Sequence, residues 1–416
     1  MSSALVLIVV VVGGYLAAHV ASGWLARRFL IVSGAEYLLL GILLGPQVSG
    51  LIGADVFGGF APFLTLALGW VGVVVGAQFY LPELVRIPAA QYRIAFFEAL
   101  LTLAAVSAAL TPIFFWLFPT TPLEAVIPAV ALGAVATGSA PTGIALVARR
   151  LGGQGQVVRQ LQLTTAIDAL VAIVAFSLLL TVSHAPPAGN VRPPTATEWA
   201  VISVAIGVVG GTLFHLFLGE ERKVDRLFIG LAGATILASG AAAYLGLSPL
   251  LPTMLIGAIL ANTSGNRDEI RRALGMVERP LYFVLLIFAG AAWAPSTRAW
   301  LLPVLAFLAV RTLGKVGGGY LAARLNGAHG VLGWGWGRAL LGQGGLAVAI
   351  ALNYMLQGET PAVNVVFTAV LVSVLLTDVA SARIAEGVVD SARRRRAATY
   401  AAAAAPRTER PAAEEA

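Results

Sequence analysis

Long apolar runs separated by short polar breaks dominate this chain. A helix needs about 20 apolar residues to cross a bilayer, and the chain holds about thirteen such runs. They lie near residues 4–22, 32–51, 58–80, 93–118, 123–148, 158–183, 198–218, 225–245, 248–263, 280–296, 299–324, 331–356 and 363–386. The pattern therefore predicts an all-α polytopic membrane protein with about thirteen transmembrane helices.

Composition excludes the main alternatives. Only 11% of the residues are charged, 58% are hydrophobic and the mean hydropathy is +0.87, whereas a soluble domain carries about 25% charged residues. A soluble fold could not cover its surface with so few charges, and a disordered chain would be far less apolar. The chain has no cysteine, which excludes disulfides and thiolate metal sites.

The net charge of +7 reflects membrane topology rather than a nucleic-acid partner, because the basic residues fall on alternate loops. With the amino terminus outside, the inside loops and carboxyl end hold Arg27, Arg28, Arg86, Arg149, Arg150, Arg159, Arg222, Lys223, Arg226, Arg267, Arg271, Arg272, Arg279, Arg324, Arg383 and Arg393 to Arg396. The outside loops hold only Arg192 and Arg298. We expect a plasma-membrane protein with a cytoplasmic carboxyl terminus. Residues 389–416 are rich in Ala, Pro and Glu, which predicts a disordered tail.

Two spans contain helix breakers at mid-membrane. The 123–148 span holds Thr-Gly-Ser-Ala-Pro-Thr-Gly at 137–143, and the 331–356 span holds Gly-Gln-Gly-Gly at 342–345. They lie seven spans apart, so they run in opposite directions through the bilayer. This arrangement is typical of inverted repeats whose two broken helices cross and build a substrate site at the midplane.

Asp168 is the strongest functional candidate, because it lies in the middle of the apolar 158–183 span. A buried carboxyl stays protonated until a cation displaces the proton, and that competition is the chemistry an antiporter requires. Hard alkali cations prefer oxygen ligands. We therefore expect Asp168 to bind the cation together with Thr164, one helical turn earlier, and with Thr137, Ser139 and Thr142 of the break. No cofactor and no other metal are expected.

Five further charged residues lie at membrane depth. Arg311 and Lys315 are four residues apart on one helix face. Either could neutralise the negative carboxyl ends of the half-helices at the breaks or pair with Asp168. Glu36 and Glu98 lie near the starts of their predicted spans, which allows a cap or interface role. Asp378 lies near the inside end, where Arg383 offers a structural partner.

Several segments together resemble the monovalent cation:proton antiporter superfamily, over roughly residues 5–388. They are Glu36 to Pro46, the 137–142 break followed by 148–153 and Asp168, and the later segments 311–315 and 342–346. The resemblance implies a homodimer built from a dimerisation domain and a mobile six-helix core. It implies core helices at about 93–183 and 299–386, and dimerisation helices at about 4–80 and 225–296.

The resemblance also implies roles for individual residues. Asp168 takes the place of the essential carboxylate, Thr164 of the hydroxyl on the same helix, Thr137 of the ligand on the unwound helix, and Arg311 or Lys315 of the core basic residue. The chain departs from the family at three places. Ile167 stands where an Asp or Asn is usual, and Leu163 stands where many electroneutral exchangers have an acid. The break at 137–142 contains no acidic residue, whereas many family members have an Asp there.

With a single carboxylate, the family pattern suggests electroneutral exchange of H⁺ for a monovalent cation, with Na⁺ first and K⁺ or Li⁺ as alternatives. The rival hypothesis is a proton- or sodium-coupled carrier of an organic or anionic solute on the same scaffold. We expect no enzyme activity, because no nucleophile motif or metal-ligand spacing is present.

Overall fold

The computed structural model describes residue 13 and residues 34–118, 121–150, 155–183, 194–295, 300–358 and 360–404; within these, some helical residues are described by backbone alone. The predicted 4–22 span therefore lies almost wholly outside the described residues. The helices are α2 (Ala35–Leu44), α3 (Ala54–Gly76), α4 (Leu81–Leu84), α5 (Ala89–Leu117), α6 (Pro122–Thr137), α7 (Pro141–Arg150), α8 (Gln156–Val182), α9 (Ala196–Leu218), α10 (Val224–Tyr244), α11 (Leu250–Thr263), α12 (Arg267–Ala291), α13 (Leu301–Leu325), α14 (His329–Leu332), η2 (Trp336–Leu340), α15 (Gly345–Leu356) and α16 (Pro361–Ala404).

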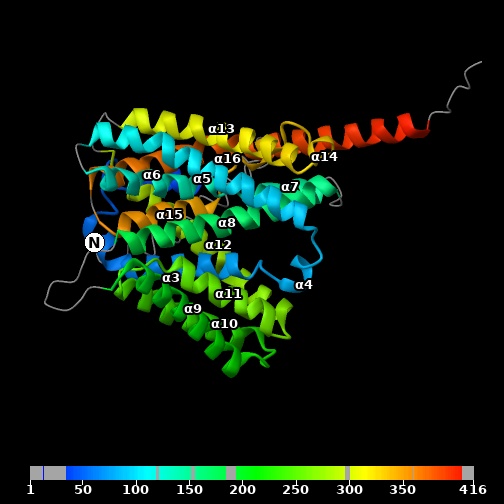
Figure 1. Ribbon diagram of the computed structural model, residues 1–416. Helices are drawn as coiled ribbons and strands as arrows, with labels where there is room; N and C mark the ends of the chain where they lie inside the picture. Colours follow the sequence, from blue (N-terminus) through cyan, green and yellow to red (C-terminus); the bar gives the residue numbers. More distant parts are fainter. Residues whose placement is uncertain are drawn as a thin grey trace, which may run out of the picture.

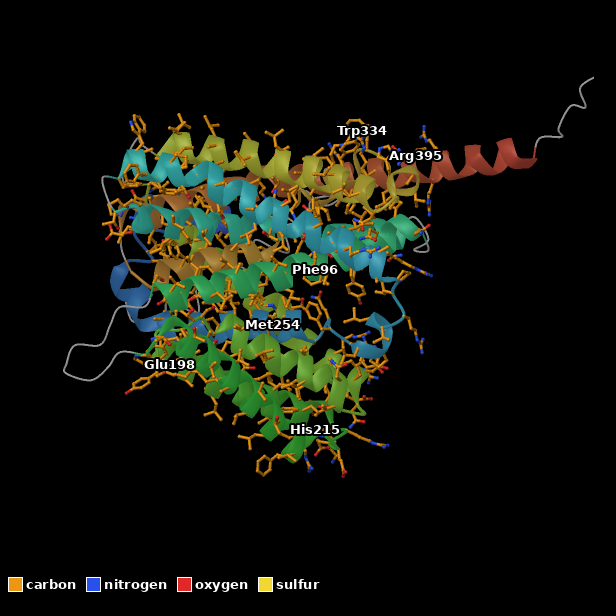
Figure 2. The ribbon with its side chains drawn as sticks, viewed as in Figure 1. Phe96, Glu198, His215, Met254, Trp334 and Arg395 are labelled. Atoms are coloured by element: carbon orange, nitrogen blue, oxygen red, sulfur yellow. The ribbon has the colours of Figure 1, made fainter. Side chains whose placement is uncertain are left out.

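The all-helical membrane fold is confirmed. Within the described residues, seven helices are long and apolar enough to cross a membrane, and shorter apolar helices lie beside them. Each of the other twelve predicted spans contains a helix. Two helices begin with a capping box, because Thr121 and Thr195 each exchange hydrogen bonds with the glutamate three residues later, Glu124 and Glu198; Glu198 is labelled in Figure 2.

The helices form two groups, which Figure 1 shows above and below α8. In the first group, α5 packs against α6, α8 and α13, and α16 packs against α7, η2 and α15. In the second group, α3 and α9 each pack against α10 and α11, and α12 packs against α2. Glycine allows the closest approaches in the second group. A Cβ atom on Gly257 of α11 would collide with the Val73 carbonyl of α3, and one on Gly41 of α2 with the Ile287 carbonyl of α12.

Both predicted helix breaks are present, and they cross. α6 ends at Thr137 and α7 begins at Pro141, while η2 ends at Leu340 and α15 begins at Gly345. The Ala140 N–H of the first break donates to the Gly342 carbonyl of the second at 2.8 Å. The backbone groups released by one break are thus partly satisfied by the other, which is the condition for irregular backbone at this depth.

The predicted loss of structure after residue 388 is wrong for residues 389–404. There α16 continues without interruption to Ala404 and extends past the other helices in Figure 1. Alanine has the highest helix propensity, and a segment that continues an existing helix needs no new nucleus. This extension lies at the same end of the molecule as α4 and α14. We call it the basic end, because the loops with Arg222, Arg267 and Arg324 are there.

Candidate ion-binding site

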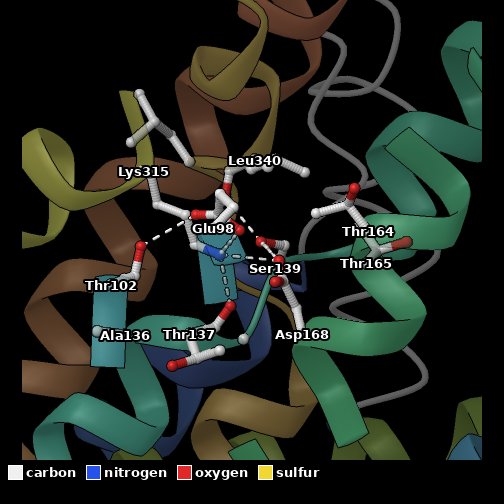
Figure 3. Close-up of polar contacts among 12 residues, drawn as sticks. Glu98, Thr102, Ala136, Thr137, Ser139, Thr164, Thr165, Asp168, Lys315 and Leu340 are labelled. Carbon is white, nitrogen blue, oxygen red and sulfur yellow. Dashed lines mark hydrogen bonds and ion pairs between the residues drawn. The ribbon is translucent and has the colours of Figure 1, made fainter. Parts of the chain in front are cut away.

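Lys315 lies at the centre of a buried cluster of charges beside the first helix break (Figure 3). Its Nζ is 2.8 Å from Asp168 Oδ2 and 3.2 Å from Glu98 Oε2, and all three side chains are completely buried. Nζ also donates to the Thr137 carbonyl at 2.7 Å, where α6 ends. With all three side chains ionised, two carboxylates face one ammonium, so the cluster carries one net negative charge.

Asp168, from the middle of α8, has one oxygen satisfied and one not. Its Oδ2 accepts from Lys315 and, at 2.6 Å, from the Ser139 hydroxyl of the break. Its Oδ1 is buried and has no hydrogen-bond partner among the described residues. A buried carboxylate oxygen without a partner is costly and calls for a bound proton or ion. This oxygen is therefore the position where a proton or a cation would be stabilised.

Glu98 is the functional candidate that the sequence reasoning undervalued. Besides Lys315, its carboxylate accepts from the Thr102 hydroxyl at 3.0 Å, and it is fully buried. The hydropathy pattern placed it one turn into a helix starting at 93, whereas α5 begins at Ala89, which moves Glu98 more than two turns inside the helix. Proline at position 88, a residue that commonly precedes or begins a helix, was the available signal for the earlier start.

The guanidinium of Arg311 donates to carbonyls at both helix breaks: Ala136 at 3.2 Å and Gly138 at 3.3 Å in the first, and Leu341 at 2.7 Å in the second. Five N–H groups in a planar fork suit this task, because one side chain can reach several carbonyls. Arg311 therefore ties the two breaks together, and Lys315 is the basic partner of the carboxylates.

Among the described hydroxyls that were predicted to surround the cation, that of Ser139 donates to Asp168. The Thr137 hydroxyl donates to the Gly133 carbonyl at 3.0 Å. Thr164 lies one turn along α8, where its hydroxyl accepts from Gln160 at 3.3 Å, and Figure 3 shows it apart from the Lys315 contacts. The Thr142 side chain lies outside the described residues.

A cavity of about 180 Å³ reaches this cluster from between the two helix groups. Its walls come from α3 and α12 on one side and from the two breaks, α7 and α8 on the other. The polar side chains that line it are Gln78, Ser139, Thr165, Glu278, Tyr282, Gln343 and Ser381. Because Ser139 and Thr165 border Asp168, the cavity is the route by which water and small ions would approach it.

The remaining acids lie apart from this cluster. Glu36 is half-buried near the start of α2, and its Oε2 has no hydrogen-bond partner in the described part of the chain. The Asp378 side chain lies outside the described residues. Within those residues no three His, Cys, Asp or Glu side chains are grouped as a metal site would require.

No family model matches the sequence, and no curated protein matches it. Two solved structures of the sodium proton antiporter MjNhaP1 from Methanocaldococcus jannaschii do match. The structure at pH 8 has a TM-score of 0.67 at 15% identity, covering 93% of this chain and 97% of that one. An electron-microscopy structure gives 0.64 at 15% identity, with 91% and 96% covered. The chain has the fold of this antiporter. At such low identity the likeness establishes the fold, and the site must be argued from the residues present.

Proposed function

We propose that the protein is a secondary active antiporter that exchanges a monovalent alkali cation for H⁺, with Na⁺ as the first candidate and K⁺ or Li⁺ as alternatives. One observation carries the proposal. A fully buried carboxylate with an unpartnered oxygen, Asp168, faces a lysine and a second carboxylate where two broken helices cross. The antiporter fold of the MjNhaP1 structures supports it.

The chemistry follows from the charges. When Lys315 is protonated and both carboxylates are ionised, one bound cation or one bound proton neutralises the cluster, so the two compete for the same place. The Asp168 oxygens and the Ser139 hydroxyl supply hard ligands of the kind an alkali cation prefers. The Thr137, Thr164 and Thr142 hydroxyls remain candidate ligands in a rearranged state of the site.

Glu98 determines how many protons are exchanged for each cation in this scheme. A cation at Asp168 weakens the attraction between Asp168 and Lys315, and an isolated buried ammonium would then lose its proton. Because Glu98 Oε2 lies 3.2 Å from Nζ, Lys315 would keep a counter-charge and its proton. One cation therefore exchanges for one proton, and transport is electroneutral. If Lys315 released its proton in each cycle, exchange would be electrogenic.

Alternating access would use the two helix groups. The helices of about 93–183 and 299–386 hold Asp168, Lys315 and both breaks, so we assign them to a mobile core. Those of about 4–80 and 225–296 would form the dimerisation domain of a homodimer in the plasma membrane. The lining of the cavity between the groups includes Gln78, Glu278 and Ser381. We propose that it opens to the basic end, which we place in the cytoplasm.

Reconstituted liposomes with an acidic interior and a pH-sensitive dye provide the test. External Na⁺, Li⁺, K⁺ or choline is added to wild-type protein, to Asp168→Asn, and to Asp225→Asn, a matched control that removes an exposed aspartate of α10. We expect cation-selective alkalinisation of the lumen with wild type and Asp225→Asn, and none with Asp168→Asn. Activity in folded Asp168→Asn would exclude this site, and silence of folded wild type with every cation would favour the carrier of an organic or anionic solute.

A further inference from the structure

A second cavity lies at the basic end, between the segment 334–341, which includes η2, and α16. Its volume is about 490 Å³, and its lining includes three arginines and two tryptophans: Arg338, Arg383, Arg395, Trp334 and Trp336. None of the described residues that line it is acidic. Three arginines in a lining without a carboxylate give this hollow a positive character, which favours an anion.

The backbone of the 332–338 turn is shaped around two of these guanidinium groups. Gly333 has a φ of 80°, a conformation that glycine adopts without strain, and a Cβ atom there would collide with the Arg395 guanidinium. A Cβ atom on Gly335 would likewise collide with the guanidinium of Arg338. A side chain at either glycine would move a guanidinium away from its present position.

Backbone and aromatic contacts hold these two arginines in place. Arg395 donates to the Leu332 carbonyl at 3.1 Å. Arg338 donates to the Gly335 carbonyl at 3.3 Å and lies 4.6 Å from the centre of the Trp334 ring. For Arg338, this single hydrogen bond uses one of the five N–H groups that a guanidinium carries. An arginine positioned this way is suited to bidentate recognition of a phosphate.

The ends of the neighbouring apolar helices indicate that the cavity lies near the membrane surface. Trp336 in its wall donates to the Gly319 carbonyl at 2.7 Å, and Gly319 belongs to the apolar helix α13, which ends at Leu325. Arg383 follows closely on the apolar segment Pro361–Thr377 of α16. Tryptophan beside arginine at this depth is typical of the headgroup region.

We propose that this cavity, the arginine pocket, binds the phosphate of an anionic phospholipid headgroup from the cytoplasmic leaflet. Basic pockets between transmembrane helices at the cytoplasmic side take such headgroups. A soluble phosphate compound shares the chemistry. The depth of Trp336 and Arg383 favours the lipid, because a membrane phosphate is already present at that level. The assignment is independent of transport.

Arg383 offers the cleanest test, because no hydrogen bond or ion pair within the described residues uses its guanidinium. Arg383→Gln therefore removes a ligand contact without removing an internal one. Arg394→Gln is the matched control, since it takes the same charge from an exposed position on the same helix but does not line the pocket. The double variant Arg338→Gln/Arg383→Gln removes two of the three guanidinium groups.

Full-length protein in detergent is titrated with dioleoyl phosphatidylglycerol or phosphatidylcholine, and bound lipid is counted by native mass spectrometry. We expect phosphatidylglycerol to bind wild type and Arg394→Gln equally, about tenfold more weakly to Arg383→Gln, and weaker still to the double variant, since one charge-assisted contact is worth roughly a factor of ten. Phosphatidylcholine should not compete.

Three results would overturn the proposal. Equal binding by all variants would place the lipid elsewhere, and an equal loss in Arg394→Gln would reduce the effect to general charge. Glycerol 3-phosphate in solution is the third arm. If it displaces the lipid at concentrations equal to those of the lipid, the site belongs to a soluble phosphate compound and the lipid assignment is wrong.

Discussion

Glu98→Gln isolates the contribution of the second carboxylate to cation binding. The substitution keeps the size of the side chain and removes its charge, so the cluster changes from one net negative charge to none. A cation bound at Asp168 would then either leave a net positive charge in a fully buried site or drive the proton from Lys315. We expect the cation to bind more weakly because its attraction to Glu98 is lost, while Asp168 remains able to carry it.

The structure sets the size of the effect. Glu98 Oε2 and Asp168 Oδ2 lie 3.2 Å and 2.8 Å from the same Lys315 Nζ. The far oxygen of Asp168 is therefore at most about 8 Å from Glu98 Oε2, so the attraction at about 8 Å is a lower limit. At an effective dielectric constant near 20, two unit charges at about 8 Å attract by about 2 kcal/mol. That energy corresponds to a roughly thirtyfold rise in the apparent KM for the cation.

Initial exchange rates in liposomes, measured against cation concentration at alkaline external pH where protons compete least, give this KM. Glu98→Asp, which restores the charge, should recover most of the affinity. Glu221→Gln serves as the control, because Glu221 lies at the basic end in contact with Arg226, far from the cluster. An unchanged KM in folded Glu98→Gln would refute the electrostatic role assigned here, as would a loss that Glu98→Asp does not recover.

Other substitutions test the remaining parts of the site and fold. Ser139→Ala should raise the KM for cation about tenfold, because it removes a hydrogen bond to a charged group, whereas Thr164→Ala should raise it less; equal effects would contradict the assignment of Ser139. In Arg311→Lys, the single ammonium group cannot reach carbonyls of both breaks. The unfolding temperature measured by fluorescence should therefore fall, while the KM for the cation stays within a fewfold range. An unchanged unfolding temperature would show that Arg311 does not hold the two breaks together. Gly257→Leu places a side chain against the Val73 carbonyl and should destabilise the α3–α11 contact by about 1–3 kcal/mol, whereas normal yield and melting would show that these helices can separate freely.

Local sequence was enough to predict the helices, the breaks and the acid in the membrane. Apolar runs of sufficient length become spanning helices whatever their partners, because the bilayer offers no other way to satisfy the backbone. Gly138, Pro141 and the glycines at 342–345 interrupt a helix for reasons contained in their own covalent structure. The isolated aspartate in the 158–183 span pointed to function through the cost of burying a charge.

Which charges meet depends on the packing of distant segments. Lys315 lies 147 residues from Asp168 and 217 from Glu98 in the chain, and hydropathy says nothing about which helix faces which. Arg311 and Lys315 share one helix face, so the sequence left open which of them pairs with the carboxylates. Packing places carbonyls of the two breaks opposite Arg311 and the two carboxylates opposite Lys315. The arginine pocket likewise depends on α16 lying against the 332–338 turn, because Arg383 and Arg395 of α16 come together with Arg338 only through that packing.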